Sequence, residues 1–117
     1  MELQTKEMNT LIESIYNLEK TIITLVQQKN EKEYHLERLK NKMRGQVEGK
    51  NQTERDAALF YYLDTDEEYT HHKKKLKEVE ITIQERKAEL NYFENLFGSY
   101  KILIRNQYID AIRRSEE

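Results

Sequence analysis

Histidine is the residue type in this chain best suited to hold a transition metal, because a neutral imidazole nitrogen is a strong ligand. The sequence contains three, which are His35, His71 and His72. His71 and His72 are consecutive, so on a helix their side chains diverge by about 100°. His35 is expected to lie well away from both, on another helix. The spacing therefore predicts no metal site.

Carboxylates and hydroxyls offer two further kinds of chemistry. Asp64, Asp66 and Glu68 alternate like the first ligands of a calcium loop, but the loop glycine and the later bidentate glutamate are missing. Acids at the start of a helix explain these residues better. The serines have no histidine or acid at a supporting spacing, and no glycine-rich phosphate loop is present; they are Ser14, Ser99 and Ser115. We therefore expect no catalytic residue, no cofactor and no enzymatic activity.

Lysine and arginine gather in two segments that could contact the phosphates of a nucleic acid. The candidate contacts are Arg38, Lys40, Lys42, Lys73, Lys74 and Lys75. Residues 37–78 contain ten basic and nine acidic side chains, however, and aromatic residues are poorly interleaved with the lysines. The net charge of −2 gives no general attraction for a polyanion. Solvated helix faces explain most of these lysines, and nucleic-acid binding is the alternative to the function argued below.

The overall composition is typical of a coiled coil or an extended helical bundle. Of 117 residues, 37% are hydrophobic and 36% are charged, and there is no Pro. Ordinary globular domains have about 45–50% apolar and about 25% charged residues, so this chain can fill a narrow apolar stripe but not a thick core. No apolar run approaches the roughly 18 residues of a membrane span. Cys is absent, which fits a reducing compartment, and we expect a cytoplasmic protein.

Two series of apolar residues at seven-residue spacing predict two long helices. The a and d positions of the first series are Met8, Leu11, Ile15, Leu18, Ile22, Leu25, Lys29, Lys32, Leu36, Leu39, Met43 and Gln46. Those of the second are Tyr62, Tyr69, His72, Leu76, Val79, Ile83, Arg86, Leu90, Phe93, Phe97, Tyr100, Ile104, Gln107 and Ala111. We therefore expect an all-α fold, a long antiparallel two-helix coiled-coil hairpin with a short corner helix. One domain would span 1–117, with helices at about 6–46 and 66–113 and the corner at about 47–65.

A hairpin that folds back at the centre of the corner sets the expected register. Residues whose numbers sum to about 113 would lie opposite each other. Lys29 and Lys32 would then lie beside three residues of the second helix, Glu80, Ile83 and Glu85. Acid would meet base where the stripe turns polar, and charges of this kind fix alignment at a cost in stability.

The three glycines mark candidate breaks in these helices. Gly98 and Ser99 leave the heptad phase unshifted, so we expect the second helix to continue through them, bent at that point. A separate third helix that begins at Ser99 is the alternative. Gly45 or Gly49 is predicted to provide a left-handed cap at the end of the first helix.

The segment between the two heptad series is predicted to be a structured corner. Asn51 with Glu54, and Thr65 with Glu68, have the spacing of a capping box. These two starts frame a short amphipathic helix at about 53–63, so the corner is more than a disordered linker.

The corner also carries the motif residues Gly49, Lys50, Asn51, Arg55 and Ala57. In the stretch "GKNQTERDAAL" they resemble small coiled-coil proteins encoded by bacteriophages and prophages, in which a Gly-Lys-Asn-x-x-x-Arg-x-Ala element links two helices. The resemblance implies a phage accessory protein, often from gene neighbourhoods of replication or recombination, and no enzyme. A structural role fits as well: Asn51 can cap the helix, Arg55 can reach the acidic stop at 64–67, and Ala57 allows close packing.

Apolar residues outside the a and d stripe gather in the half that carries both termini. Because a lone hairpin cannot cover both its seam and these side chains, they predict an interface. The residues are Ile12, Tyr16, Ile23, Val26, Tyr92, Leu96, Leu103, Tyr108, Ile109 and Ile112. Self-association into a four-helix arrangement is expected first, and a helix of another protein second. The predicted function is binding to itself or to a replication, recombination or host-defence component; a purely structural spacer is the third class.

Overall fold

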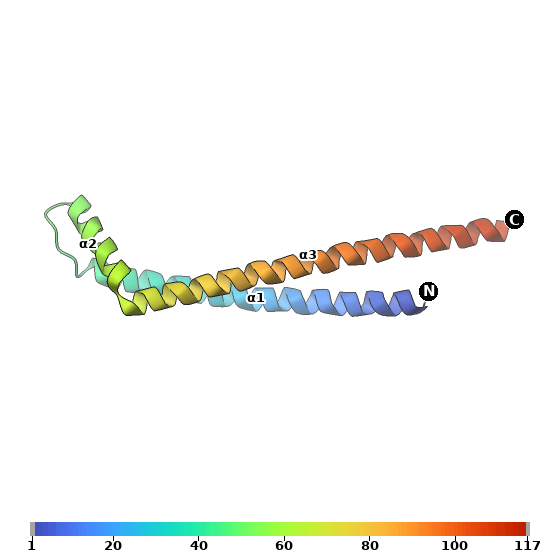
Figure 1. Ribbon diagram of the computed structural model, residues 1–117, viewed down its shortest axis with the longest axis horizontal. Coiled ribbons are helices and arrows are strands. Elements are labelled where there is room, and N and C mark those ends of the chain that lie inside the picture. Colours follow the sequence, from blue (N-terminus) through green and yellow to red (C-terminus); the bar gives the residue numbers. More distant parts are fainter. Residues whose placement is uncertain (1, 117) are drawn as a thin grey trace. The chain divides into compact units, whose positions relative to one another are not determined.

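The computed structural model describes residues 2–116, which form three α-helices. α1 spans Glu2–Arg44, α2 spans Gln52–Thr65 and α3 spans Glu67–Glu116 (Figure 1). The described residues contain no strand, so the predicted all-α class with two long helices and a short corner helix is confirmed. Each helix begins and ends within four residues of its predicted bounds. None of the described helices combines the length and the hydropathy needed to cross a membrane.

The described chain divides into two compact units, and the single domain over 1–117 stays a prediction. The terminal unit comprises the described residues up to Ile23 and those from Gln84 onward. The central unit comprises Thr24–Ile83. α1 and α3 each contribute a segment to both units, whereas α2 lies wholly in the central unit.

Two antiparallel helical segments make the terminal unit. The first turns of α1 meet the second half of α3, since Leu11 lines one groove together with Leu96 and Tyr100. Every predicted a and d side chain of this unit is buried or half-buried except Ala111, which is exposed. The heptad pattern therefore identifies the seam, because residues three and four apart share one side of a helix.

The central unit adds α2 to the antiparallel segments of α1 and α3. Leu59 and Leu63, one turn apart on α2, are buried and line a groove with Lys40 and Arg44 of α1. The a and d positions here are again buried or half-buried except Gln46 and Tyr62. Both exceptions lie outside the long helices: Gln46 follows the end of α1, and Tyr62 belongs to α2.

The register differs from the predicted one. In the central unit the rings of His35 and His72 pack with centroids 4.4 Å apart. In the terminal unit the Tyr100 hydroxyl donates a hydrogen bond to the Glu7 carboxylate. The residue numbers of each pair sum to 107, not to about 113. Apolar a and d layers interlock only at heptad steps, so their packing, and not the midpoint of the corner, sets the alignment.

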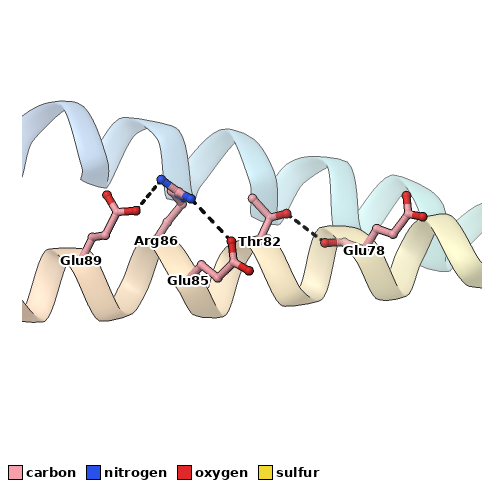
Figure 2. A network of polar contacts seen from close by, with 5 residues as sticks. All are labelled: Glu78, Thr82, Glu85, Arg86 and Glu89. Atoms are coloured by element: carbon pink, nitrogen blue, oxygen red, sulfur yellow. Dashed lines mark hydrogen bonds and ion pairs between the residues drawn. The ribbon is translucent and has the colours of Figure 1, made fainter.

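The predicted pairing of Lys29 and Lys32 with acids of the opposite helix is wrong. Lys29 forms an ion pair with Glu33, one turn along α1, with 3.7 Å between Nζ and Oε1. The polar residue of the second stripe behaves in the same way, because Arg86 pairs with its α3 neighbours Glu85 and Glu89 (Figure 2). These charges are satisfied within their own helices, so they do not align the two helices.

Caps at the corner follow the prediction at α2 but not at α3. The Asn51 side chain accepts a hydrogen bond from the Glu54 N–H at 2.9 Å, and the Glu54 carboxylate accepts from the Lys50 N–H at 2.8 Å. Thr65 was expected to cap α3, but it is the last residue of α2, and Asp66 accepts from the Tyr69 N–H instead. The single extended residue between the two helices therefore provides the cap (φ −78°, ψ 121°).

The predicted left-handed cap at Gly45 or Gly49 is wrong, because none of the described glycines has a positive φ. Gly49 is needed for a close approach instead. A Cβ there would lie 2.9 Å from the backbone nitrogen of Arg55 and 3.0 Å from the Cβ of Glu54. Gly98 differs, since α3 is continuous through it and a Cβ there would meet nothing within 4 Å.

Two expectations for the corner motif also fail. Arg55 was expected to reach the acidic stop, but its guanidinium donates to the Gly49 carbonyl oxygen and to the Gln52 side chain, each at 3.3 Å. Arg55 lies in the first turn of α2, and nine residues of helix, about 13 Å, separate it from Asp64. Ala57, expected at a close contact, is exposed.

Alanine substitution at these two glycines is expected to change stability in opposite directions. Gly49→Ala should lower the free energy of unfolding by about 1–3 kcal/mol, because its methyl group would overlap the start of α2. Gly98→Ala should raise it by about 0.5–1 kcal/mol, because alanine loses less backbone entropy in a helix interior. Urea denaturation followed by circular dichroism would measure both, and an equal effect of the two substitutions would contradict the close approach at Gly49.

Candidate functional site

Apolar exposure distinguishes the terminal unit from the central unit. Large apolar side chains that are exposed in the terminal unit form what we call the terminal apolar surface: Leu3, Ile12, Tyr16, Ile23, Tyr92, Ile102, Leu103, Tyr108 and Ile112. Among the described residues of this unit only Leu11 is a buried apolar side chain, whereas the central unit buries Leu36, Leu59, Leu63 and Ile83. The described part of the terminal unit therefore exposes nine large apolar side chains and buries one. The central unit exposes five and buries four; its exposed side chains are Tyr34, Phe60, Tyr61, Tyr62 and Ile81.

The terminal apolar surface contains seven of the ten predicted interface residues. Leu96 and Ile109 are half-buried in the same unit, and Val26 is half-buried in the central unit. Leu3 and Ile102 were missed. Leu3 precedes the first heptad, and Ile102 belongs to the run Ile102–Ile104, in which consecutive apolar residues on a helix must point about 100° apart.

An open groove of about 500 Å³ lies within the terminal unit. Its lining residues are Leu3, Lys6, Glu7, Thr10, Leu11, Leu96 and Tyr100. Leucines from both helices are exposed to it, and Lys6 and Glu7 provide one charge of each sign. A groove with apolar side chains and a polar rim suits an inserted apolar side chain better than a small charged ligand.

Tyr100 and Glu7 make the polar contact of this groove. The Tyr100 hydroxyl donates a hydrogen bond to the Glu7 carboxylate, which raises the pKa of Tyr100 above its usual value of 10.0. Desolvation and the negative charge of Glu7 act in the same direction, because each disfavours a tyrosinate at this position. The contact joins α1 to α3 at one level of the terminal unit.

Charged side chains cover parts of the aromatic rings in this unit. The Lys20 ammonium lies 5.2 Å from the centroid of the Tyr16 ring, and the Lys101 ammonium lies 5.4 Å from that of Phe97. Such contacts contribute about 0.5–1 kcal/mol at exposed sites. The outer faces of the terminal unit therefore combine apolar side chains with lysines around them.

All six of the predicted nucleic-acid contacts lie in the central unit, and four of them have neighbours that can be named. Lys40 and Lys73 line one groove with Phe60, Tyr69 and Asp64. The guanidinium of Arg38 lies 5.9 Å from the Tyr34 ring centroid, and Lys75 pairs with Glu78 at 3.6 Å. The other two predicted contacts, Lys42 and Lys74, are exposed. The expectation of poorly interleaved aromatics fails at this groove, because α2 brings Phe60 to Lys40 and Lys73.

The expectation that His35 lies well away from the other histidines is wrong. His35 of α1 packs edge-on against His72 of α3, with an interplanar angle of 78°. Glu68, four residues before His72, completes a group whose ligand atoms all lie within 4.8 Å of one another. The observed register explains the contact, because residues whose numbers sum to 107 face each other and His35 therefore meets His72. The predicted alignment placed His35 near residue 78.

Comparison of the chain with models of protein families, with curated proteins and with solved structures finds no match. The functional argument therefore rests on the geometry of the two units.

Ionisation of Tyr100 offers a test of the groove contact. Because the pKa of Tyr100 is raised in the folded protein, its hydrogen bond contributes stability below pH 10 that is lost as the pH rises through the folded pKa. Tyr100→Phe should remove a component of tyrosine ionisation that titrates above pH 10, measured by ultraviolet absorbance, and Glu7→Gln should move that component to lower pH. Tyr108→Phe, at an exposed tyrosine, is the control, and loss of the same component in this control would contradict the assignment.

Proposed function

We propose that this protein acts without catalysis, by binding another helical protein through the terminal apolar surface, and that its first partner is a second copy of itself. The observation that carries the proposal is the contrast between one buried and nine exposed large apolar side chains in the terminal unit. Exposed apolar surface concentrated in one region is typical of an interface. Two further helices packed on it would make a four-helix arrangement.

Association is favourable only if much of this surface is buried. Burying a large apolar side chain contributes about 1.5–3 kcal/mol, and these nine are already partly covered, so about half of their sum, roughly 7–13 kcal/mol, is available from each of the two copies. Association costs about 4–15 kcal/mol in lost freedom of motion. A stable dimer must therefore bury much of the terminal apolar surface of both copies, and the loss of one or two anchors should be visible in the association constant.

An unpaired polar atom within the terminal unit agrees with this proposal. Oε1 of Gln107, at a d position of α3, is buried and has no hydrogen-bond partner among the described residues. Buried polar atoms in native proteins are almost always paired. A donor from a partner helix packed against this part of α3 would satisfy the oxygen.

A protein of another kind is the second partner that the proposal includes. The corner motif resembles phage and prophage coiled-coil proteins, so a replication, recombination or host-defence component is the class we would test after self-association. The proposal keeps the cytoplasmic location expected from the sequence.

Self-association can be tested with two matched pairs of exposed aromatic residues. Tyr16→Gln with Tyr92→Gln changes side chains of the terminal unit that are 58% and 63% exposed. Phe60→Gln with Tyr61→Gln changes side chains of α2 that are 73% and 66% exposed. The first pair should weaken association at least about a hundredfold, because a dimer loses four anchors, two from each copy, of about 0.8 kcal/mol or more each, and the second pair should leave it unchanged.

Sedimentation velocity would measure the assembly, with circular dichroism to confirm that all variants stay helical. A wild-type chain that sediments as a monomer at micromolar concentration would contradict self-association and leave the hetero-partner. Equal dissociation by both pairs would contradict the assignment of the interface to the terminal unit.

A nucleic-acid-binding function is the second candidate, and the groove of Lys40 and Lys73 favours it. Phe60 and Tyr69 in the same groove offer rings on which a base can stack. Asp64 lines this groove as well and repels phosphate, and Glu78 neutralises the neighbouring Lys75. The local charges thus partly cancel, which is why we rank this function below protein binding.

Salt dependence separates the two functions. Contacts to phosphates give a log–log slope of about −0.7 to −0.9 per contact, whereas an apolar interface is almost indifferent to moderate salt. We expect only weak binding of nucleic acid in gel-shift titrations, lost at physiological salt. Submicromolar binding at that salt, removed by alanine at Lys73, Lys74 and Lys75 but kept by Lys6→Ala with Lys101→Ala, would reverse the ranking.

A further inference from the structure

The central unit brings three metal-binding side chains together at its α1–α3 seam. These are His35 of α1 with Glu68 and His72 of α3, and one ligand atom from each lies within 4.8 Å of the others. We propose that His35, Glu68 and His72 bind a divalent transition-metal ion, with Zn²⁺ as the principal occupant. This inference does not depend on the proposed function, because the terminal apolar surface belongs to the other unit.

Helix geometry explains how the group forms. Glu68 and His72 are four residues apart in α3, so their side chains lie on the same face one turn apart. His72 occupies a d position, which turns it toward α1, and the ring of His35 packs against it at 4.4 Å. Two ligands therefore come from one helix and the third comes from its neighbour within the same unit.

The ligand types match a known class of zinc site. Two imidazoles and one carboxylate are a set that holds Zn²⁺ with a fourth position left for water. Ligand atoms around a tetrahedral Zn²⁺, at about 2.0–2.1 Å from the ion, lie about 3.4 Å apart. The present group must therefore contract by about 1.4 Å, a shift that side-chain rotation can supply where His35 and His72 are half-buried and Glu68 is exposed.

The ligand atoms of this group have no other polar partner in the described part of the chain. His35, Glu68 and His72 make no hydrogen bond or ion pair there, and the contacts of the two histidines are between rings. The Asp66 carboxylate is occupied as the cap of α3. The exposed His71 ring packs edge-on against His72 with centroids 5.5 Å apart, but it is not part of the group of converging ligand atoms. The positive end of the α3 dipole beside Glu68 opposes a cation, but this effect is small against the affinity of two imidazoles and a carboxylate.

A bound ion would join α1 to α3 in the central unit. The three ligands converge only in the folded chain, so the ion binds the native state in preference to the unfolded state and raises the melting temperature with its concentration. The unfolded chain also offers histidines to the ion, but without the convergence of all three ligands.

The test uses the full chain without a histidine tag. Titration calorimetry with ZnCl₂ should give one ion per chain, and Co²⁺ in its place should give the visible absorption of a tetrahedral nitrogen and oxygen site. His72→Ala and His35→Phe should each lower the affinity at least about a hundredfold, because losing even an outer-shell partner costs about 10–100-fold. His35→Phe keeps a ring at the seam, so a purely structural role of His35 would leave metal binding intact.

His71→Ala is the matched control, since it removes the adjacent histidine and keeps the three ligands. It should bind Zn²⁺ as the wild type does, and Zn²⁺ should raise the melting temperature of both but not of the His72→Ala protein. The proposal is overturned if the wild type binds no more Zn²⁺ than the His72→Ala protein does. It is equally overturned if His71→Ala loses as much affinity as His72→Ala, because that result describes non-specific binding by surface histidines.

Discussion

One apolar stripe on each long helix is the constraint on which this structure depends. Two helices touch along a line, so the residues of a single seam stay open to water on both sides. Only five large apolar side chains of the described chain are buried, and none is fully buried. Stability must therefore come from the length of the seam and from any further helix that covers it.

The two units meet this constraint in different ways. In the central unit α2 adds a third helix, which buries Leu59 and Leu63 in a groove with Lys40 and Arg44 of α1. The terminal unit has no third helix among the described residues, and nine large apolar side chains outside its seam stay exposed. The corner helix thus relieves the shortage of cover for two leucines, while its own Phe60, Tyr61 and Tyr62 stay exposed. In the terminal unit the same shortage gives, in our proposal, a binding surface.

Polar residues within the stripe take two different roles. Lys29 and Arg86 pair with acids of their own helices, so they occupy seam positions without linking the helices. His72, at a d position of α3, instead packs across the seam against His35, which lies beside the stripe of α1 just before Leu36, because an imidazole is flat and short enough to pack there as an apolar ring does. A polar residue of the stripe can thus carry chemistry where a polar side chain of the other helix reaches it.

The sequence by itself determined what depends on neighbouring residues. Heptad spacing located α1 and α3, and Asn51 with Glu54 marked the start of α2, because helical periodicity and caps involve residues within one or two turns. The same spacing separated Ile12, Tyr16 and Tyr92 from the seam, so much of the candidate surface could be anticipated, while Leu3 and Ile102 could not because they lie outside or across the repeat.

Only the tertiary structure decided the register. The alignment in which His35 meets His72, rather than a residue near 78, is the sum of many weak layer contacts that recur every seven residues, and no short segment encodes that sum. Gly49 is similar, since its need for space comes from the fold of the corner onto Arg55 and not from its own backbone angles. Contacts between residues distant in sequence are chosen by packing over the whole seam, and for this physical reason the histidine cluster was invisible until the helices were paired.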